Sequence, residues 1–418
     1  MQENMSILDI INENCPDGVE YKKLGTIGKF YGGITGKSKK DFSNGNAKFI
    51  TYKNVYDNNA INFNVTDKVK IGKDECQNTL QYCDVCFTGS SETPDECGLS
   101  SVVTEIPKEN MYLNSFCFFF RFNDTSNVNP LYLKHLFRSQ NLREQINKTA
   151  QGVIRFNVSK KRMENVIIPL PPLTIQTEIA KILDQFEELE KELEKELKMR
   201  IDQYEYYRNM LLSFDDSVEM KKLGEVCNFQ NGYAFKSNLF VKKGNPIVRI
   251  TNIDGHNILM DDVKYFNFND YKTDLSSFIV NKNDILIALS GATTGKVGQY
   301  KSDKPIYINQ RVGKFLPNKN QLDNQYLFHV LLMNKEKLFE LASGAGAQPN
   351  LSSTKLMNKL EIPVPSLEIQ ESIAETLDQF DELCTSLTNG IPAEIEMRKE
   401  QYEYYRNLLL NFKNINEQ

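Results

Sequence analysis

The second half of the chain repeats the first half in the same order of segments. The repeated pairs, first copy then second, are VEYKKLG at 19–25 and VEMKKLG at 218–224, IPLPPLTIQTEIAKILDQFEEL at 168–189 and IPVPSLEIQESIAETLDQFDEL at 362–383, and QYEYYRN at 203–209 and 401–407. Each second copy follows its first by about 193 to 200 residues. Because a long internal repeat constrains the architecture before composition is considered, we expect two similar units.

Each half ends in a tail with the spacing of a helix. In the first tail, from about Leu173 to Phe214, apolar residues recur in steps of three and four, while Glu and Lys fill the opposite face. This pattern predicts a helix with one apolar stripe, close to a coiled-coil seam. About 40 residues at 1.5 Å each make a rod of about 60 Å. The stripe needs a partner, so we expect the two tails to pair as antiparallel helices.

The second tail repeats this pattern with an interruption. Gly390 and Pro392 fall within it, so we expect a kink or a short break before Ile395.

The segments before the tails are mixed in character. Short β-like runs such as KFITY and PIVRI lie between turns rich in Gly, Asn and Asp. We therefore expect an α/β (α+β) fold in which two similar globular domains are separated by two long antiparallel helices, with an internal pseudo-two-fold repeat. The expected segments are the globular domains at 1–170 and 216–362 and the helical spacers at 171–215 and 363–418.

The charge is unevenly distributed between these segments. The whole chain carries 50 Lys+Arg against 55 Asp+Glu, a formal net charge of −5. Residues 18–172 nevertheless hold 21 basic and 15 acidic groups, residues 218–366 hold 19 and 13, and the two tails are acidic. Each globular segment thus carries a formal net charge of +6, which is the electrostatic pattern expected of a module that binds a phosphate backbone.

Several other classes of protein are disfavoured. No run approaches eighteen uncharged apolar residues, and the N-terminus lacks a basic start followed by an apolar stretch, so we expect neither a membrane protein nor a secreted one. Eight dispersed cysteines suit a reducing cytoplasm, and the four between positions 76 and 97 include one close pair, so we expect no metal site. His135 and His329 occupy equivalent places beside leucines, which favours packed structural histidines. With three histidines in all, we expect no catalytic residues.

A duplicated basic module on a stiff helical frame predicts the reading of two separated nucleic-acid sites. Because the two modules differ in sequence, the two half-sites are expected to differ as well. The target would be bipartite and asymmetric.

The candidate DNA-binding residues lie in polar, glycine-containing loops that recur in both halves. Such loops offer Arg and Lys for guanine and phosphate, Asn and Gln for adenine, and hydroxyl groups for phosphate oxygens. In the first half the candidates are Lys37, Ser38, Lys39, Lys53, Ser90, Ser91, Arg155, Asn157, Ser159 and Lys160.

The second half has its own set of candidates in corresponding loops, and a solvated turn is the competing interpretation for each of them. Asn157 and Ser159 align with Asn350 and Ser352. The full second set is Lys236, Ser237, Arg249, Thr251, Asn252, Thr293, Thr294, Lys296, Gln310, Arg311, Gln348, Asn350 and Ser352.

The two QYEYYRN copies have two interpretations. Their tyrosines could pack in the helix seam, or Tyr and Arg on the outer face could anchor a protein partner. The candidate partner-binding residues are Tyr204, Tyr207, Arg208, Tyr402, Tyr405 and Arg406.

The duplicated plan, the two IPLPPLTIQTEIAKILDQ-like junctions, the two QYEYYRN tails and the loops GVIRFNVS and GAQPNLS resemble a DNA specificity subunit of a type I restriction–modification enzyme. The resemblance covers essentially the whole chain. It implies two target-recognition domains that each read half of a bipartite target, with two helical regions packed antiparallel as spacer and ruler. It also implies a cytoplasmic bacterial protein.

The resemblance places the chemistry in other subunits. It implies two methyltransferase subunits that modify adenine in double-stranded DNA with S-adenosylmethionine, and through them ATP- and Mg-dependent restriction subunits. The chain itself would bind no cofactor and catalyse nothing. The alternative from a different class is a helical scaffold or adaptor that binds protein partners without reading DNA.

Overall fold

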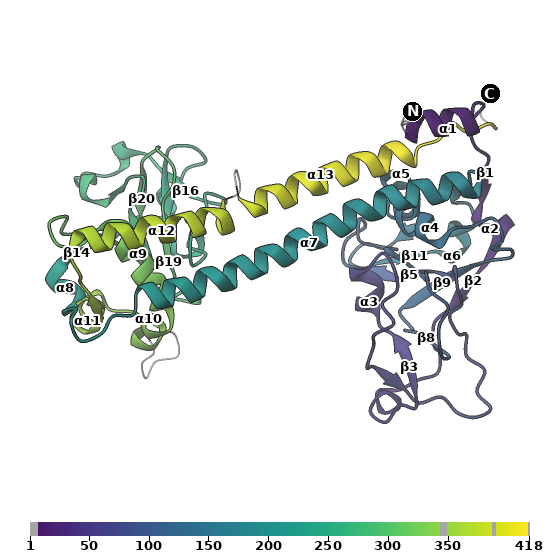
Figure 1. Ribbon diagram of the computed structural model, residues 1–418, viewed down its shortest axis with the longest axis horizontal. Coiled ribbons are helices and arrows are strands. Elements are labelled where there is room, and N and C mark those ends of the chain that lie inside the picture. The colour runs from purple at the N-terminus through teal and green to yellow at the C-terminus, as the bar shows by residue number, and fades with distance from the viewer. Residues whose placement is uncertain (1–6, 343–348, 387–389, 417–418) are drawn as a thin grey trace. The chain divides into compact units, whose positions relative to one another are not determined.

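The computed structural model describes residues 7–342, 349–386 and 390–416. The chain divides into two compact units, one comprising residues 1–194 with 394–418 and the other residues 195–393. Each unit combines a globular module with parts of both helical tails (Figure 1).

The first module is built around a four-stranded sheet whose neighbouring strands run antiparallel. In spatial order the strands are β2 (Gly28–Gly32), β9 (Cys117–Phe122), β5 (Val85–Thr88) and β7 (Ser100–Val102). Strand β9 reads CFFFRF, and the rings of Phe118 and Phe120 face Phe30 at 5.9 and 5.1 Å between centroids. The alternate side chain, Phe119, packs on the other face with Tyr31 at 5.3 Å. A strand buried on both faces therefore explains the nearly continuous aromatic run.

Three smaller sheets complete the strands of this module. They are β4 (Lys68–Val69), β3 (Ala47–Ile50) and β8 (Tyr112–Leu113); β10 (Ala150–Gln151), β11 (Phe156–Val158) and β6 (Ser90–Ser91); and β1 (Tyr21–Lys23) with β12 (Ile167–Pro169). The pair β3–β8 is parallel.

Short helices surround the sheets of the first module. They are α1 (Ile7–Asn14), α2 (Leu24–Ile27), η1 (Lys39–Phe42), α3 (Tyr52–Asp57), α4 (Pro130–Leu136), α5 (Gln140–Asn147) and α6 (Lys160–Met163). Helix α4 brings Leu133 and Leu136 into a core that also contains Ile179 from the first helical tail and Leu409 from the second. The module therefore shares its core with both tails.

The second module follows the same plan. Its strands, in spatial order, are β14 (Cys227–Asn231), β21 (Val312–Pro317), β18 (Ile285–Ala288) and β19 (Val297–Gln299) in one sheet, β16 (Lys264–Phe266), β15 (Asn245–Val248), β20 (Ile306–Ile308) and β17 (Ile279–Val280) in another, and β13 (Met220–Lys222) with β22 (Glu361–Pro363). The first sheet matches β2–β9–β5–β7 strand for strand, and the parallel pair β15–β20 matches β3–β8. The sequence duplication is thus a duplication of fold, and the expected α/β class is confirmed.

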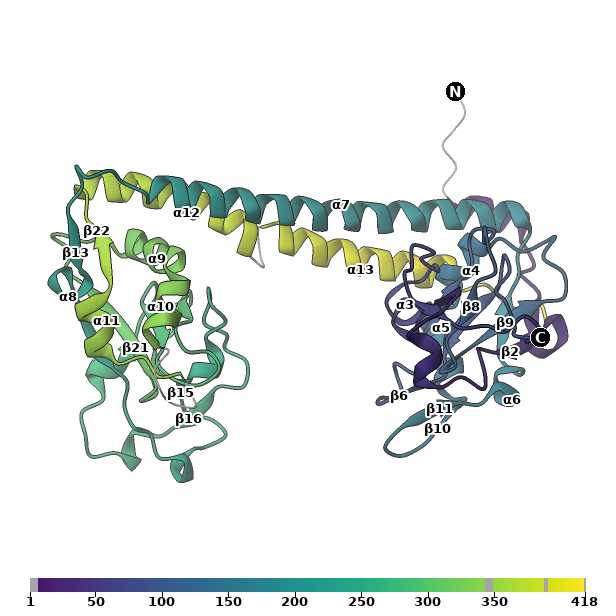
Figure 2. The same ribbon diagram turned by 90° about the horizontal axis from the view of Figure 1, so that it is seen from below.

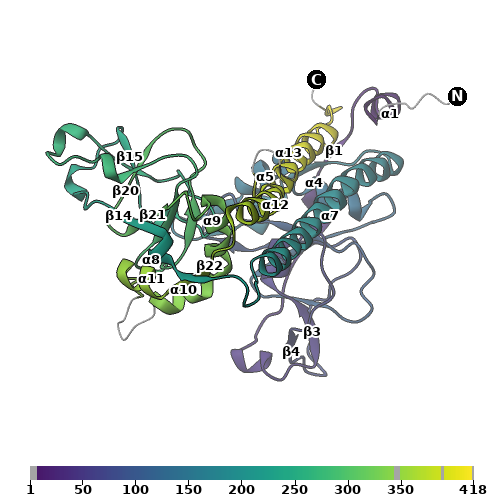
Figure 3. The same cartoon turned by 60° about the vertical axis from the view of Figure 1, so that its left-hand side comes forward.

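Most helices of the second module have a counterpart in the same order in the first, apart from two short ones between β16 and β17. The helices of the second module are α8 (Leu223–Val226), η2 (Ser237–Leu239), η3 (Ile250–Asn252), η4 (Phe268–Asp270), η5 (Ser276–Phe278), α9 (Asn324–Met333), α10 (Lys335–Ala342) and α11 (Ser353–Lys359). Helix α9 packs within the second unit beside the helical tail (Figure 3). It also contacts β19.

Both tails are helical. The first is a single helix, α7 (Leu173–Leu211), of 39 residues. The second consists of α12 (Leu367–Thr385) and α13 (Ile391–Leu409), so the predicted break before Ile395 is confirmed, with Pro392 in the first turn of α13. Within the first unit α7 runs antiparallel to α13, with Phe186 stacked on Tyr405 at 5.2 Å between centroids. Within the second unit Tyr207 of α7 stacks on Phe380 of α12 at 5.3 Å.

A buried glutamine near the start of each tail fixes the helix to its module. Gln176 accepts a hydrogen bond from the Asn129 amide at 2.8 Å and donates to the Pro171 carbonyl at 2.8 Å. Gln370 makes the same pair of bonds, to the Asp323 amide and the Pro365 carbonyl, at the same distances. Because a buried amide must be satisfied, this accounts for the shared Ile-Gln in the two junction sequences.

Within the described ranges, none of the helices combines the length and the apolar character needed to span a bilayer.

Candidate nucleic-acid interface

The candidate DNA-binding loops gather at one edge of the large sheet in each module. In the first module this edge contains the end of β2 at Gly32, the start of β9 at Cys117, the end of β5 at Thr88 and the start of β7 at Ser100. The matching edge of the second module lies where β14 ends, β21 begins, β18 ends and β19 begins. Antiparallel pairing alternates strand directions, so loops distant in sequence meet at one edge.

Strand pairing joins two of the predicted loops directly. In the first module Asn157 lies opposite Ser90 in the β11–β6 ladder. In the second module a single bridge joins Asn350 to Ser290. The predicted equivalence of Asn157 and Asn350 is therefore confirmed by their register.

The first-module edge encloses a cavity of about 810 Å³. Arg155 Nε donates to Ser90 Oγ at 3.2 Å, and Tyr52 Oη donates to the Ser90 carbonyl at 2.7 Å. The lining, which we call the first-module cavity, consists of Tyr52, Tyr56, Ser90, Ser91, Glu92, Glu96, Phe116, Ile154 and Arg155. Guanidinium, hydroxyl and carboxylate groups together could contact both phosphates and base edges.

Acidic groups in this cavity were missed by the sequence reasoning. Hydrogen bonds from Tyr56, Thr93 and Ser91 lower the pKa of Glu96, so this carboxylate is ionised at neutral pH. Glu92 lies beside it on the cavity wall. Carboxylates at a DNA-facing edge can accept a hydrogen bond from the amino group of cytosine. The sequence indicates these acids at residues 90–96, SSETPDE, where Glu and Asp closely follow the two predicted serines.

Several predicted residues are exposed and available to a ligand. Lys160 Nζ lies 5.7 Å from the centre of the Phe118 ring at the first-module edge. The exposed candidates are Lys39, Lys53, Arg155, Asn157, Lys160, Lys236, Ser237, Thr251, Lys296, Gln310, Arg311 and Asn350. Gln348 lies outside the described residues.

Other predicted residues form bonds that stabilise the loops in which they lie. Ser159 accepts from the Arg162 amide at the start of α6, and Ser352 caps α11 in the same way. Ser38 bonds to Asp41 at the start of η1, and Lys37 pairs with Glu75. N-capping satisfies helix donors that would otherwise lack partners, so these serines are structural groups beside the edge.

The structure corrects the prediction for a buried group of candidates. Asn252 is buried, accepting from the Arg249 amide and donating to the Asp261 carbonyl. Thr294 is buried and donates within 3.1 Å of the Gly291 and Pro349 carbonyls. These loops fold back on themselves, and their polar side chains satisfy buried backbone groups instead of facing outward.

Three more candidates form hydrogen bonds or an ion pair with residues of their own module. Ser91 is buried and donates to Glu96, Thr293 donates to the Ile250 carbonyl at 3.0 Å, and Arg249 pairs with Asp262 at 3.2 Å. Ser90 is also buried, although its hydroxyl accepts from Arg155 at the cavity wall.

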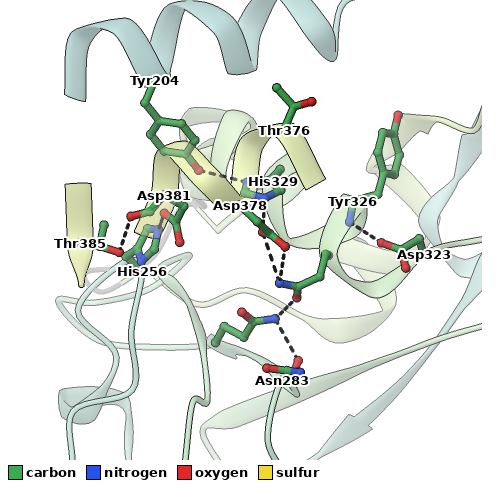
Figure 4. A network of polar contacts seen from close by, with 12 residues as sticks. Tyr204, His256, Asn283, Asp323, Tyr326, His329, Thr376, Asp378, Asp381 and Thr385 are labelled. Atoms are coloured by element: carbon green, nitrogen blue, oxygen red, sulfur yellow. Dashed lines mark hydrogen bonds and ion pairs between the residues drawn. The ribbon is translucent and has the colours of Figure 1, made fainter. Parts of the chain in front are cut away.

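A Tyr–His–Asp chain ties the second module to the helical tails (Figure 4). Tyr204 Oη lies 3.0 Å from His329 Nδ1, and His329 Nε2 lies 2.8 Å from an Asp378 carboxylate oxygen. Because a carboxylate accepts, Nε2 carries the proton. Asp378 is also contacted by Gln325 at 3.1 Å. His329 is thus buried and bonded at both nitrogens, which matches the predicted structural role.

The first module has the same chain with an added cation. Tyr402 Oη lies 2.9 Å from His135 Nδ1, and His135 Nε2 lies 2.6 Å from Asp184. Lys134 Nζ contacts Asp184 at 2.8 Å and Glu187 at 2.9 Å. Burial alone would lower the pKa of Lys134, but the two carboxylates outweigh it and raise the pKa above its ordinary value.

This cluster contains the chemistry of a metal site. His135, Asp184 and Glu187 bring ligand atoms within 4.8 Å of one another. Lys134 supplies a positive charge to both carboxylates, and burial lowers the pKa of His135 despite its bond to Asp184. The Lys134 ammonium group therefore neutralises the two carboxylates, which would otherwise need a metal ion to offset their charge. Cys83 and Cys86 are also poor ligands, since burial raises the pKa of the Cys83 thiol to about 12 and that of the Cys86 thiol well above its ordinary value.

Most tyrosines and arginines of the two QYEYYRN copies pack against other residues of the chain. Tyr204, Arg208 and Tyr402 are buried, and Tyr207 and Tyr405 stack on helical phenylalanines. Arg406 lies 5.1 Å from the Tyr402 ring centre. Burial corrects the prediction that Tyr204, Arg208 and Tyr402 are surface anchors, and packing within the chain explains the motif. Tyr206 and Tyr404 are mostly exposed, and Tyr405 remains 38% exposed despite its stacking on Phe186.

The chain therefore contains two equivalent α/β modules, and helical tails complete each of them. Each module has a polar sheet edge with exposed Lys and Arg side chains. These features define a duplicated recognition protein. The family model for the type I restriction modification DNA specificity domain matches residues 16–203 and 215–397. The chain belongs to this family.

Similar sequences agree with this assignment, and a solved structure shares the fold. The chain is 34% identical over 263 residues to the type I restriction enzyme EcoR124I/EcoR124II specificity subunit of Escherichia coli, covering 61% of this chain and 65% of that protein. It is 31% identical over 301 residues to a putative specificity subunit of Haemophilus influenzae, covering 69% and 74% of the two chains. Its fold resembles the type I restriction-modification S subunit of M. genitalium with a TM-score of 0.54 at 14% identity, over 94% and 96% of the chains.

Proposed function

We propose that the chain is the sequence-reading subunit of a type I restriction–modification system. Each module reads one half of a bipartite, asymmetric target in double-stranded DNA. Two adenine methyltransferase subunits, and restriction subunits where the system has them, act on the DNA to which this chain directs them. S-adenosylmethionine, ATP and Mg belong to those partners, and this chain binds DNA without catalysis.

The observation that carries the proposal is the equivalence of the two sheet edges. The same strand order and the same Asn–Ser pairing recur, but the exposed groups differ. The strand registers place Phe116 of the first module where the second module has Arg311, ahead of β9 and β21 respectively. One scaffold with two sets of exposed groups is what two unlike half-sites require.

The helical tails support the spacing role. At 1.5 Å per residue, a helix of 39 residues extends about 58 Å, between one and two turns of duplex DNA at about 34 Å each. We propose that the tails set the gap between the half-sites.

The test is a map of methylated adenines in a host expressing the modification subunits with and without this chain. The expected result is one bipartite motif that appears with the chain and is absent without it. Purified complex should prefer duplexes with that motif and lose affinity as salt rises. A scaffold that does not read DNA would give no chain-dependent motif.

A further inference from the structure

Two of the most exposed apolar side chains lie at the tip of the β10–β11 hairpin. Val153 is 92% exposed and Ile154 is 91% exposed. Phe116, which is 61% exposed, lines the first-module cavity together with Ile154. Large apolar groups grouped at one exposed place mark an interaction surface more often than isolated ones do.

The hairpin is held in shape by its neighbours. Gly152 has a φ of +146°, and a Cβ there would lie 1.9 Å from the Arg155 carbonyl oxygen, so the turn depends on glycine. On its far side β11 pairs with β6, placing Phe156 opposite Ser91. Figure 2 shows the β10–β11 hairpin projecting from the first unit. The tip therefore presents Val153 and Ile154 on a two-stranded ribbon.

The ribbon itself carries the charge that suits a polyanionic partner. Residues 148–163 contain no Asp or Glu, and their basic residues are Lys148, Arg155, Lys160, Lys161 and Arg162. The nearby acids, Glu92 and Glu96, belong to the cavity wall beside Ile154 and Arg155. A two-stranded ribbon fits the major groove of duplex DNA, which is about 12 Å wide. In that groove thymine presents a 5-methyl group, the apolar feature that aliphatic side chains can recognise.

We propose that Val153 and Ile154 are specificity-determining residues that pack against thymine 5-methyl groups in the half-site read by the first module, with Phe116 beside them. The inference rests on the proposed function and names the chemistry by which one module reads bases. Arg155 follows the apolar pair directly and can contact a guanine or a phosphate next to the thymine.

The second module lacks this element in its sequence. Aligned on Asn157 and Asn350, Val153 and Ile154 correspond to Gly346 and Ala347, which lie outside the described residues. The large aliphatic pair at this position is therefore a feature of the first module, and we expect its methyl contacts in the half-site that this module reads.

The test uses the reconstituted methyltransferase complex and a duplex carrying the mapped target, with each thymine replaced in turn by deoxyuridine. Removing a contacted methyl group should weaken binding by about four-fold. We expect this at one or two thymines of the first-module half-site. A variant with V153S and I154S should bind the unmodified duplex about ten-fold more weakly and be insensitive to those replacements.

The matched control is Ile106→Ser. Ile106 is 77% exposed and follows β7 at the opposite edge of the sheet, so this variant should keep wild-type affinity and wild-type sensitivity to deoxyuridine.

Three results would overturn the inference while the complex still prefers its target. The wild type could be insensitive to deoxyuridine in that half-site, or the double variant could keep the sensitivity. The double variant could also lose assembly with methyltransferase subunits while its DNA contacts are unchanged, which would make the tip a protein contact. If the wild-type complex showed no preference for the mapped duplex, the proposed function would fail and the inference with it.

Discussion

At the scale of single residues, the two modules give equivalent acids of the helical tail different partners. In the first unit Lys134 lies between Asp184 and Glu187. In the second unit the equivalent position is Phe328, and the acid equivalent to Glu187, Asp381, pairs with His256 from a loop of the module. The Tyr–His–Asp chain is the same in both units. The repeat therefore preserves a buried polar link between module and tail, while the residue that contacts the neighbouring acid has changed.

Replacing Lys134 with methionine should destabilise the first unit. Lys134 is buried, and its loss leaves two carboxylates without their cation, which costs about 3 kcal/mol in the free energy of unfolding. Lys399→Met is the control, because Lys399 also contacts two acids of α7, Glu190 and Glu194, but at an exposed site. That change should cost less than about 1 kcal/mol. Urea unfolding of both variants measures the difference, and equal midpoints would contradict a buried ion cluster.

At the scale of elements, regular patterns were predictable and loop orientation was not. The start of α7 at Leu173 and the break near Gly390 follow from periodicity and from helix-breaking residues. The burial of Asn252 and Thr294 depends on how each loop folds back on its own backbone, which composition does not encode. Tyr402 was recognisable as part of a repeat, but its contact with His135, 267 residues away, required the fold. The loop that contains Val153 was predicted, but its apolar tip was not, because polar side chains make most base contacts and large apolar ones are usually buried.

The attachment of each tail to its module can be tested at Gln176. Gln176→Ala removes bonds to the Asn129 amide and the Pro171 carbonyl and leaves those buried groups without partners. The expected loss is about 2 kcal/mol in the free energy of unfolding. Glu178→Ala, at an exposed position on the same helix, should change it by less than about 0.5 kcal/mol. Chemical unfolding followed by circular dichroism would measure the free energy of unfolding of both variants. Equal values for the two variants would refute the anchoring role of Gln176.

At the scale of the whole molecule, the two halves of the sequence are not the two units of the structure. The first unit takes in residues 394–418, and Tyr402 from this segment is buried against His135 of the first module. The second unit takes in the end of α7, whose Tyr204 contacts His329. Each recognition module is thus completed by a helical tail from the other repeat. Truncating the chain after the first half would remove part of the first unit's core.

The central claim is that one module reads one half-site, and exchanging a module tests it most directly. Residues 218–362 would be replaced by the corresponding segment of a relative that keeps the histidine of α9, and methylated adenines would be mapped in cells expressing the modification subunits. We predict that one half of the bipartite motif changes while the other half stays the same. A change in both halves, or in neither, would contradict the account.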